Sequence, residues 1–283
     1  MMNFTLPNGN FIPAIGFGTW QAAEGEICVS SVKCALESGY RHIDTAAAYG
    51  NEASVGRAIR EFLAEHPEVK REDIFVTSKL WNKERGYDTT HRAFEATMSA
   101  FALDYIDLYL IHWPASASRF EDWEQINLDT WRAMTELYKA GRVRAIGVSN
   151  FLPHHLRALM ETEIMPMVDQ IEFHPGYMQA ETLRLCHSNA ILVEAWSPLG
   201  TGKVLGDETL GSIAAKYGKS TAQLCIRWCM QHGTLPLPKS VTPARIAQNL
   251  DVEDFIISDA DMAAIDALPA IGYSGHHPDE IRF

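Results

Sequence analysis

Four ionisable residues in the first half of the chain stand at or just after the ends of short apolar segments. Asp44 ends "RHID", Lys79 ends "IFVTSK" and His112 ends "LYLIH". Tyr49 follows the first of these segments by five residues. A phenol with a pKa near 10 is a poor proton donor at neutral pH, but a nearby lysine cation favours the phenolate and a carboxylate keeps that lysine charged. A neutral histidine would orient a substrate oxygen. Held together, such groups would protonate a carbonyl oxygen while a hydride arrives from elsewhere.

Two other kinds of chemistry would use the same residues. Lys79 would serve as the amine nucleophile of a Schiff-base aldolase. His42 or His112 would contribute to a metal site, but no further ligand is spaced to complete one, so no metal is expected. A single acid, lysine or histidine at a strand end is more often structural than catalytic. The hypothesis therefore depends on the elements that bring these residues together.

Short apolar segments alternate along the chain with longer amphipathic segments, after a hairpin around Asn8-Gly9. This alternation predicts parallel strands joined by helical crossovers. The predicted strands are Ile15–Gly18, Arg41–Asp44, Ile74–Lys79, Ile106–His112, Ala145–Ser149, Met167–Glu172, Leu192–Ser197 and Leu235–Pro238. The predicted helices are Gly25–Ser38, Glu52–Glu65, Thr89–Leu103, Leu128–Ala140, Leu152–Glu161, Gln179–Asn189, Thr209–Tyr217, Thr221–Gln231, Pro243–Leu250 and Asp259–Leu268.

Eight strands in this order predict an α/β fold, a (β/α)8 TIM barrel with an N-terminal β-hairpin and two extra helices. An open doubly wound sheet is the alternative, but no G-x-G-x-x-G motif occurs. No linker divides the chain, so residues 1–283 are expected to form a single domain. Because the carboxyl ends of barrel strands share one face, Asp44, Lys79 and His112 should meet there.

Composition narrows the classes of protein. Apolar residues make up 47% of the 283-residue chain, enough for a sizeable core. A net charge of −12 argues against a nucleic-acid binder. No secretory signal and no apolar run of about 18 residues is found, so no membrane association is expected. Five cysteines without regular spacing predict a reduced, cytoplasmic protein, and a monomer is expected.

The second half of the chain contains a candidate anion-binding segment, "PLPKSVTPARIAQN". Lys239, Ser240 and Arg245 stand there at the end of the last predicted strand and the start of its helix. Cations at a helix N-terminus oppose the macrodipole, so their presence favours an anionic ligand. Trp196, at the end of the seventh predicted strand, offers a flat face on which a ring would stack. Three tryptophans at other strand ends predict the walls of a substrate pocket: Trp20, Trp81 and Trp113.

Five motifs carry a resemblance to a known family. They are "GYRHIDTAAAYGNEASVG", "TSKLWN", "DYIDLYLIHWP", "GRVRAIGVSNF" and "LPKSVTPARIAQN", in this order. With them the chain resembles the aldo-keto reductase family over nearly its whole length. Trp196 stands where a tyrosine is usual, which is similar to the bacterial branch of 2,5-diketo-D-gluconate reductases.

The resemblance implies a metal-free, NADPH-dependent reductase of small aldehydes and ketones, in which Tyr49 is the general acid of a set with Asp44, Lys79 and His112. It implies nicotinamide contacts from Ser149, Asn150 and Gln170, with the ring stacked on Trp196. It implies pyrophosphate contacts from Ser197, Leu199 and Gly200. The adenosine 2′-phosphate end of NADPH/NADP+ would meet Lys239, Ser240, Val241, Thr242, Arg245, Gln248 and Asn249.

Two features depart from the family pattern. Gln248 replaces a glutamate that often contacts the adenine. The tail "PAIGYSGHHPDEIRF" is short, which suggests an open pocket for small polar carbonyls, among them α-dicarbonyls and sugar-derived substrates such as 2,5-diketo-D-gluconate. The partner expected is thus a small-molecule carbonyl. The alternative function is that of a non-catalytic, NADPH-binding regulatory member of the same fold.

Overall fold

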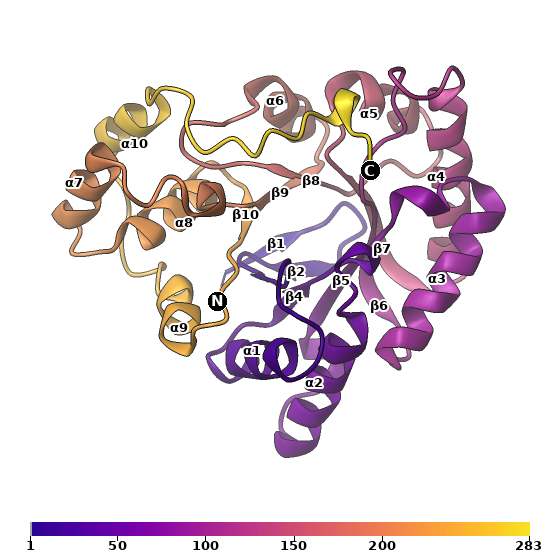
Figure 1. The fold of residues 1–283 in the computed structure, drawn as a ribbon, viewed down its shortest axis with the longest axis horizontal. Helices are drawn as coiled ribbons and strands as arrows, with labels where there is room; N and C mark the ends of the chain where they lie inside the picture. The colour runs from indigo at the N-terminus through magenta and orange to yellow at the C-terminus, as the bar shows by residue number, and fades with distance from the viewer. Residues whose placement is uncertain (1) are drawn as a thin grey trace.

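Parallel strands form the centre of the computed structural model, which describes residues 2–283 (Figure 1). Eight strands are hydrogen-bonded in the order in which they occur in the chain. The two edges of this eight-stranded sheet meet where the backbone N–H groups of Gly16 and Gly18 donate to the carbonyls of Pro236 and Pro238, each at 3.0 Å. The predicted (β/α)8 barrel is therefore confirmed. The strands are β3 (Phe17–Gly18), β4 (His42–Asp44), β5 (Phe75–Leu80), β6 (Ile106–Ile111), β7 (Val143–Ser149), β8 (Val168–Glu172), β9 (Leu192–Trp196) and β10 (Leu235–Leu237).

Helices surround the barrel, and two of them lie between β9 and β10, as the sequence predicts. One helix begins five residues before its predicted start at Leu128. Its added turn is held in place by Asn127, whose side chain is hydrogen-bonded to both backbone groups of Ala115 at 2.8 and 3.1 Å. The helices are α1 (Glu26–Glu37), α2 (Glu52–Glu65), α3 (Tyr87–Phe101), α4 (Trp123–Lys139), α5 (Pro153–Met160), α6 (Ala180–Ser188), α7 (Glu208–Lys216), α8 (Thr221–Gln231), α9 (Pro243–Leu250) and α10 (Asp259–Asp266).

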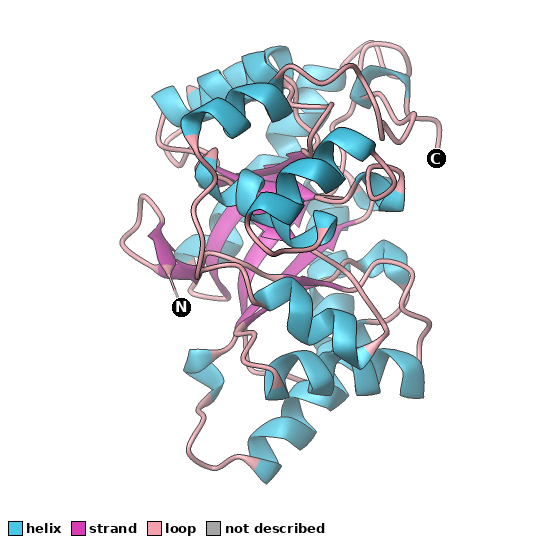
Figure 2. Ribbon diagram, turned by 90° about the vertical axis from the view of Figure 1, so that its left-hand side faces the viewer, coloured by secondary structure: helices cyan, strands magenta, loops and turns pink. Residues whose placement is uncertain are grey.

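The predicted hairpin is present as β1 (Asn3–Thr5) and β2 (Phe11–Pro13), and it projects beside the N-terminus (Figure 2). Gly9 has φ 84° and closes the turn by donating to the carbonyl of Leu6 at 2.8 Å. The side-chain amides of Asn8 and Asn10 donate to the carbonyl of Arg144, near the start of β7. The hairpin thus lies at the N-terminal end of the strands and leaves the carboxyl ends free for a site.

The tail after α10 returns across the top of the molecule and ends right of centre, below α5, in this view (Figure 1, yellow). Ser274 donates from its backbone nitrogen and its hydroxyl to the buried Glu172 carboxylate at 2.8 and 2.7 Å. Phe283 stacks on Trp81, with ring centroids 5.7 Å apart. The tail therefore reaches the carboxyl-end face of the barrel although it is short. Among the helices of residues 2–283, none has the length and apolarity that a membrane crossing requires.

Candidate active site

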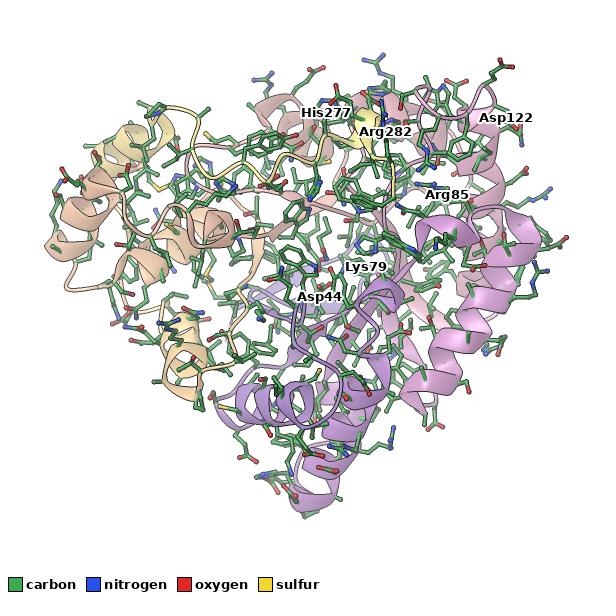
Figure 3. All side chains as sticks on the ribbon, in the orientation of Figure 1. Asp44, Lys79, Arg85, Asp122, His277 and Arg282 are labelled. Atoms are coloured by element: carbon green, nitrogen blue, oxygen red, sulfur yellow. The ribbon has the colours of Figure 1, made fainter. Side chains whose placement is uncertain are left out.

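Asp44 and Lys79 form an ion pair inside the barrel (Figure 3). Because β4 and β5 are parallel neighbours, their carboxyl ends lie side by side. The Lys79 Nζ donates to both Asp44 oxygens at 2.8 Å and to the carbonyl of Thr45 at 2.9 Å. Burial acts to lower the pKa of Lys79, but Asp44 and Tyr49 outweigh it, and the pKa is raised. Lys79 is thus a fixed cation, which does not suit the amine nucleophile of a Schiff-base aldolase.

Tyr49 lies against this ion pair. It ends a single 3-10 turn, Ala47–Tyr49, and its hydroxyl is 3.5 Å from Lys79 Nζ. Desolvation by the surrounding protein raises the pKa of the phenol, and the charge of Lys79 acts in the opposite direction. The charge of Lys79 therefore favours the phenolate, but its effect on the pKa of Tyr49 does not outweigh burial. The phenol is held protonated.

His112 completes the group. Its ring meets the rings of Tyr49 and Trp81 edge to face, with centroids 5.6 and 5.3 Å away. Burial, assisted by the charges of Lys79 and Arg85, holds the pKa of His112 well below its usual value. The imidazole is therefore neutral. Among residues 2–283, its Nδ1 is buried without a hydrogen-bond partner, whereas Nε2 is not among the fully buried atoms that lack one. Nε2 is thus the atom available to a substrate oxygen.

The predicted nicotinamide contacts form a connected set around Asn150, which follows β7. The Asn150 Nδ2 donates to the carbonyl of His112 and to Ser149 Oγ, each at 3.0 Å. Its Oδ1 accepts from Trp196 Nε1 at 2.7 Å. Asn150 has φ 64°, a left-handed conformation that asparagine tolerates better than most residues. Asn150 therefore fixes both the indole of Trp196 and the backbone of His112.

Gln170 connects these residues to the ion pair. Its Nε2 donates to Asp44 Oδ2 at 2.9 Å and to Glu194 Oε2 at 2.7 Å. Glu194 is completely buried on β9, and sequence reasoning missed it. The signal was an acid inside the apolar strand "LVEAW", two residues before Trp196 and hence on the same face.

The predicted phosphate segment offers donors that the protein does not use. Lys239 and Arg245 form no ion pair within residues 2–283, and Lys239 Nζ contacts only the carbonyl of Gln21, at 3.4 Å. Within residues 2–283, the backbone N–H groups of Ser240 and Val241 in this segment, and that of Leu199 after β9, donate to no acceptor. Free cations and N–H groups of this kind fit a phosphate-bearing cofactor. The other predicted cofactor residues lie on two segments. Ser197 and Gly200 follow β9, and Thr242, Gln248 and Asn249 lie before or within α9.

Two of the three predicted pocket tryptophans come together around Phe283. The ring of Phe283 is parallel to that of Trp81 and meets Trp113 edge to face at 5.8 Å. Trp113 also faces Trp196 at 6.5 Å. Trp20 is 46% exposed and has no aromatic neighbour in the described chain. Phe283 was not predicted, because an aromatic residue in a polar tail carries no periodic signal.

Two arginines are hydrogen-bonded to the backbone of this aromatic group, Arg85 to the carbonyl of Trp113 at 3.2 Å and Arg119 to the main-chain oxygen of Phe283 at 3.3 Å. Arg85 donates only to carbonyls, at Asn82, Trp113 and Pro114. Burial and the charge of Arg119 lower the pKa of Arg85 to about 10. A cavity of about 580 Å³ is lined by Ser118, Arg119, Glu280 and Arg282.

A histidine cluster holds the tail to α5. The Nε2 atoms of His154 and His155 each lie 3.0 Å from Asp279 Oδ1. The Nδ1 of His155 accepts the Leu152 N–H at 3.1 Å, so the proton of this neutral ring is on Nε2. A protonated Nε2 cannot ligate a metal, so the cluster is better described as a polar contact between α5 and the tail, in which the pair of His154 and Asp279 is hydrogen-bonded.

Comparisons with known proteins agree with this geometry. The family model described as Aldo/keto reductase family matches residues 14–270. The "Glyoxal reductase" of Bacillus subtilis is 47% identical over 279 residues, covering 98% of this chain and 96% of the relative. The "Methylglyoxal reductase DkgA" of Escherichia coli is 40% identical and covers 97% and 96%. A Bombyx mori aldo-keto reductase, crystallised in complex with NADP, superposes with a TM-score of 0.85 at 37% identity, covering 94% of this chain and 92% of that one.

Proposed function

This chain belongs to the aldo/keto reductase family, and we propose that it reduces small aldehydes and ketones with NADPH. The observation that carries the proposal is the arrangement of Tyr49 between a fixed cation and a neutral imidazole. The Tyr49 hydroxyl is 3.5 Å from Lys79 Nζ, and its ring meets that of His112. This combination supplies a proton donor and a hydrogen-bond donor to the same oxygen.

The role of each residue follows from its surroundings. The bound cofactor supplies the hydride. Tyr49 gives its proton to the carbonyl oxygen, and Lys79 stabilises the phenolate that remains. His112, being neutral, donates from Nε2 and orients the carbonyl. Asp44 keeps Lys79 charged and in place, which explains why β4 ends on a carboxylate.

The cofactor would lie across the ends of β7 to β10. Gln170 and the Ser149–Asn150 pair would meet the nicotinamide, which Trp196 would cover. The free N–H group of Leu199 suits a pyrophosphate. Lys239, Ser240 and Arg245 suit the 2′-phosphate that distinguishes NADPH from NADH, since neither cation has an ion-pair partner within residues 2–283.

The substrates would be small and polar. The relatives named for glyoxal and methylglyoxal support α-dicarbonyls. Arg119 and Arg282 form no ion pair with an acidic side chain of the described residues, although Arg119 donates to the main-chain oxygen of Phe283 at 3.3 Å. Both line the cavity beside the tail together with Glu280, and the excess of positive charge there supports a carboxylate-bearing carbonyl such as 2,5-diketo-D-gluconate. The short tail favours small substrates, and Phe283, which packs against Trp81 and Trp113, would form part of the pocket wall.

The experiment is NADPH oxidation, followed by absorbance, with a panel of carbonyls. Glyoxal, methylglyoxal, 2,5-diketo-D-gluconate and simple aldehydes would be compared at equal concentration, with NADH in parallel. Turnover that prefers NADPH and α-dicarbonyls would support the proposal. Tight NADPH binding without turnover of any carbonyl would contradict it. We also propose that the enzyme acts as a cytoplasmic, single-domain monomer, which the five free cysteines suit.

A further inference from the structure

A second carboxyl group, Glu194, lies inside the barrel below the residues described above. It is completely buried on β9, and its Oε2 accepts from Gln170 Nε2 at 2.7 Å. The same nitrogen donates to Asp44 Oδ2 at 2.9 Å. Both hydrogens of the Gln170 amide are therefore directed at acids. Because the reversed amide would place its oxygen against the Asp44 carboxylate, only one orientation is favourable.

This orientation leaves the Gln170 carbonyl oxygen free. Oε1 accepts no hydrogen bond within residues 2–283, and it is not among the buried polar atoms that lack a partner. Oε1 is thus available to accept a hydrogen bond from the carboxamide N–H of a nicotinamide. We propose that Glu194 is a positioning residue: it fixes the Gln170 amide and couples its own ionisation to the charge of the nicotinamide. The second part rests on the proposed use of a nicotinamide cofactor.

The surroundings of Glu194 make its ionisation sensitive to a nearby charge. Burial and the carboxylate of Asp44 raise the pKa of Glu194 to about 8, while Gln170 and Lys79 act against them. Within the described part of the chain, its Oε1 has no hydrogen-bond partner. His42, from β4, is 3.9 Å from Oε1, and burial keeps that imidazole neutral by lowering its pKa to about 3. The neighbouring β10 strand, Leu235–Leu237, carries no titratable side chain.

The affinities for the oxidised and the reduced cofactor should therefore depend differently on pH. The oxidised nicotinamide ring carries a positive charge and the reduced ring does not. When the oxidised form binds, the Glu194 carboxyl releases its proton to solvent, because the carboxylate stabilises the cation. By linkage, the affinity for NADP+ should rise with pH, whereas the affinity for NADPH should not.

The test is the dissociation constant of NADP+, measured by quenching of tryptophan fluorescence from pH 6.5 to 9.5. In the native protein, binding should tighten by about three- to tenfold across this range. Glu194→Gln keeps the shape and the acceptor oxygen, and it should abolish this pH dependence. Asp169→Asn is the matched control, because it removes another fully buried acid, one that contacts Phe151 rather than Gln170. It should behave like the native protein.

The proposal would be overturned if the NADP+ dissociation constants of the native and Glu194→Gln proteins varied with pH in the same way. Loss of the pH dependence in Asp169→Asn would also overturn it. If Glu194→Gln does not fold, the ratio of NADP+ to NADPH affinity in the native protein decides, since a ratio constant with pH contradicts the coupling. The turnover of carbonyl substrates is measured separately, so that the proposed function and the role of Glu194 are tested independently. A protein that shows the pH-dependent binding but reduces no carbonyl would refute the proposed function and leave the role of Glu194 standing.

Discussion

Lys79 Nζ lies 2.8 Å from each carboxylate oxygen of Asp44, in a pocket closed to solvent. The pair connects the proposed proton donor to the proposed nicotinamide contacts, because Tyr49 and Gln170 both contact it. Tyr49 lies on one side, 3.5 Å from the ammonium. Gln170 lies on the other and donates to the same carboxylate. A full charge therefore remains next to the phenol.

Replacing the lysine should impair both stability and turnover. Lys79→Met leaves Asp44 as an uncompensated buried charge, which should lower the free energy of unfolding by about 3–5 kcal/mol. The double variant Lys79→Met/Asp44→Asn should regain most of this stability but no turnover, because the phenolate still lacks its cation. Urea unfolding and NADPH oxidation measure the two effects. Recovery of activity in the double variant would contradict the assigned role of Lys79.

Removing the cations of the phosphate segment should change cofactor choice. Lys239→Ala and Arg245→Ala should each weaken NADPH binding by about 1.5–3 kcal/mol, the range for hydrogen bonds to charged groups, while NADH binding changes little. Dissociation constants from fluorescence quenching give this comparison. Lys203→Ala is a suitable control, because Lys203 donates to the carbonyl of Tyr273 and lies outside the proposed phosphate contacts. Equal losses of binding free energy for NADPH and NADH would show that the two cations do not contact the 2′-phosphate.

A single added methyl group should disturb the closure of the barrel. A Cβ at Gly16 would lie 2.5 Å from Leu237 Cδ2 and 2.6 Å from His42 Nδ1. Gly16→Ala should therefore cost about 1–3 kcal/mol of stability. Gly206→Ala, which meets no atom within 4 Å, should change it by less than about 0.5 kcal/mol. Denaturant unfolding of both variants tests the difference, and equal stabilities would contradict the close packing at this point.

The buried Glu194 should also make stability depend on pH. Its pKa in the folded protein is about 8 and its ordinary value is 4.5, so the folded state retains a proton that the unfolded state releases between these values. Stability should therefore fall as the pH rises from about 4.5 to 8. Glu194→Gln lacks this ionisation. The difference in free energy of unfolding between the variant and the native protein should therefore move in favour of the variant by a few kcal/mol from pH 5 to pH 9, on the order expected from the pKa shift of Glu194. Unfolding by urea at both pH values measures this. A constant difference between the two proteins would contradict the raised pKa.

Much of the barrel could be predicted because its signals are local. Each strand is a short apolar run, and the crossovers have helical periodicity, so all eight strands were predicted in the correct order. Asp44, Lys79 and His112 could be expected to meet because the ends of parallel strands lie on one face. The early start of α4 was missed because it depends on the tertiary contact between Asn127 and Ala115.

The rest of the site depends on contacts distant in sequence. Nothing local to Phe283 indicates that it stacks on Trp81, nor that Asp279 meets His154 and His155. Trp20 was grouped with the other tryptophans because it follows a strand, but the residue is 46% exposed and does not contact them. Glu194 was recognisable only as an acid in an apolar strand, and its bond to Gln170 required the three-dimensional structure.

The most direct test of the account is the turnover of Tyr49→Phe. This substitution removes only the hydroxyl that lies beside Lys79. With methylglyoxal and NADPH, kcat should fall by about 10²–10⁴-fold, the usual contribution of a general acid. The NADPH dissociation constant should remain within about twofold of the native value, since the hydroxyl is not among the proposed cofactor contacts. Near-native turnover with normal NADPH binding would contradict the assignment of Tyr49 as the proton donor.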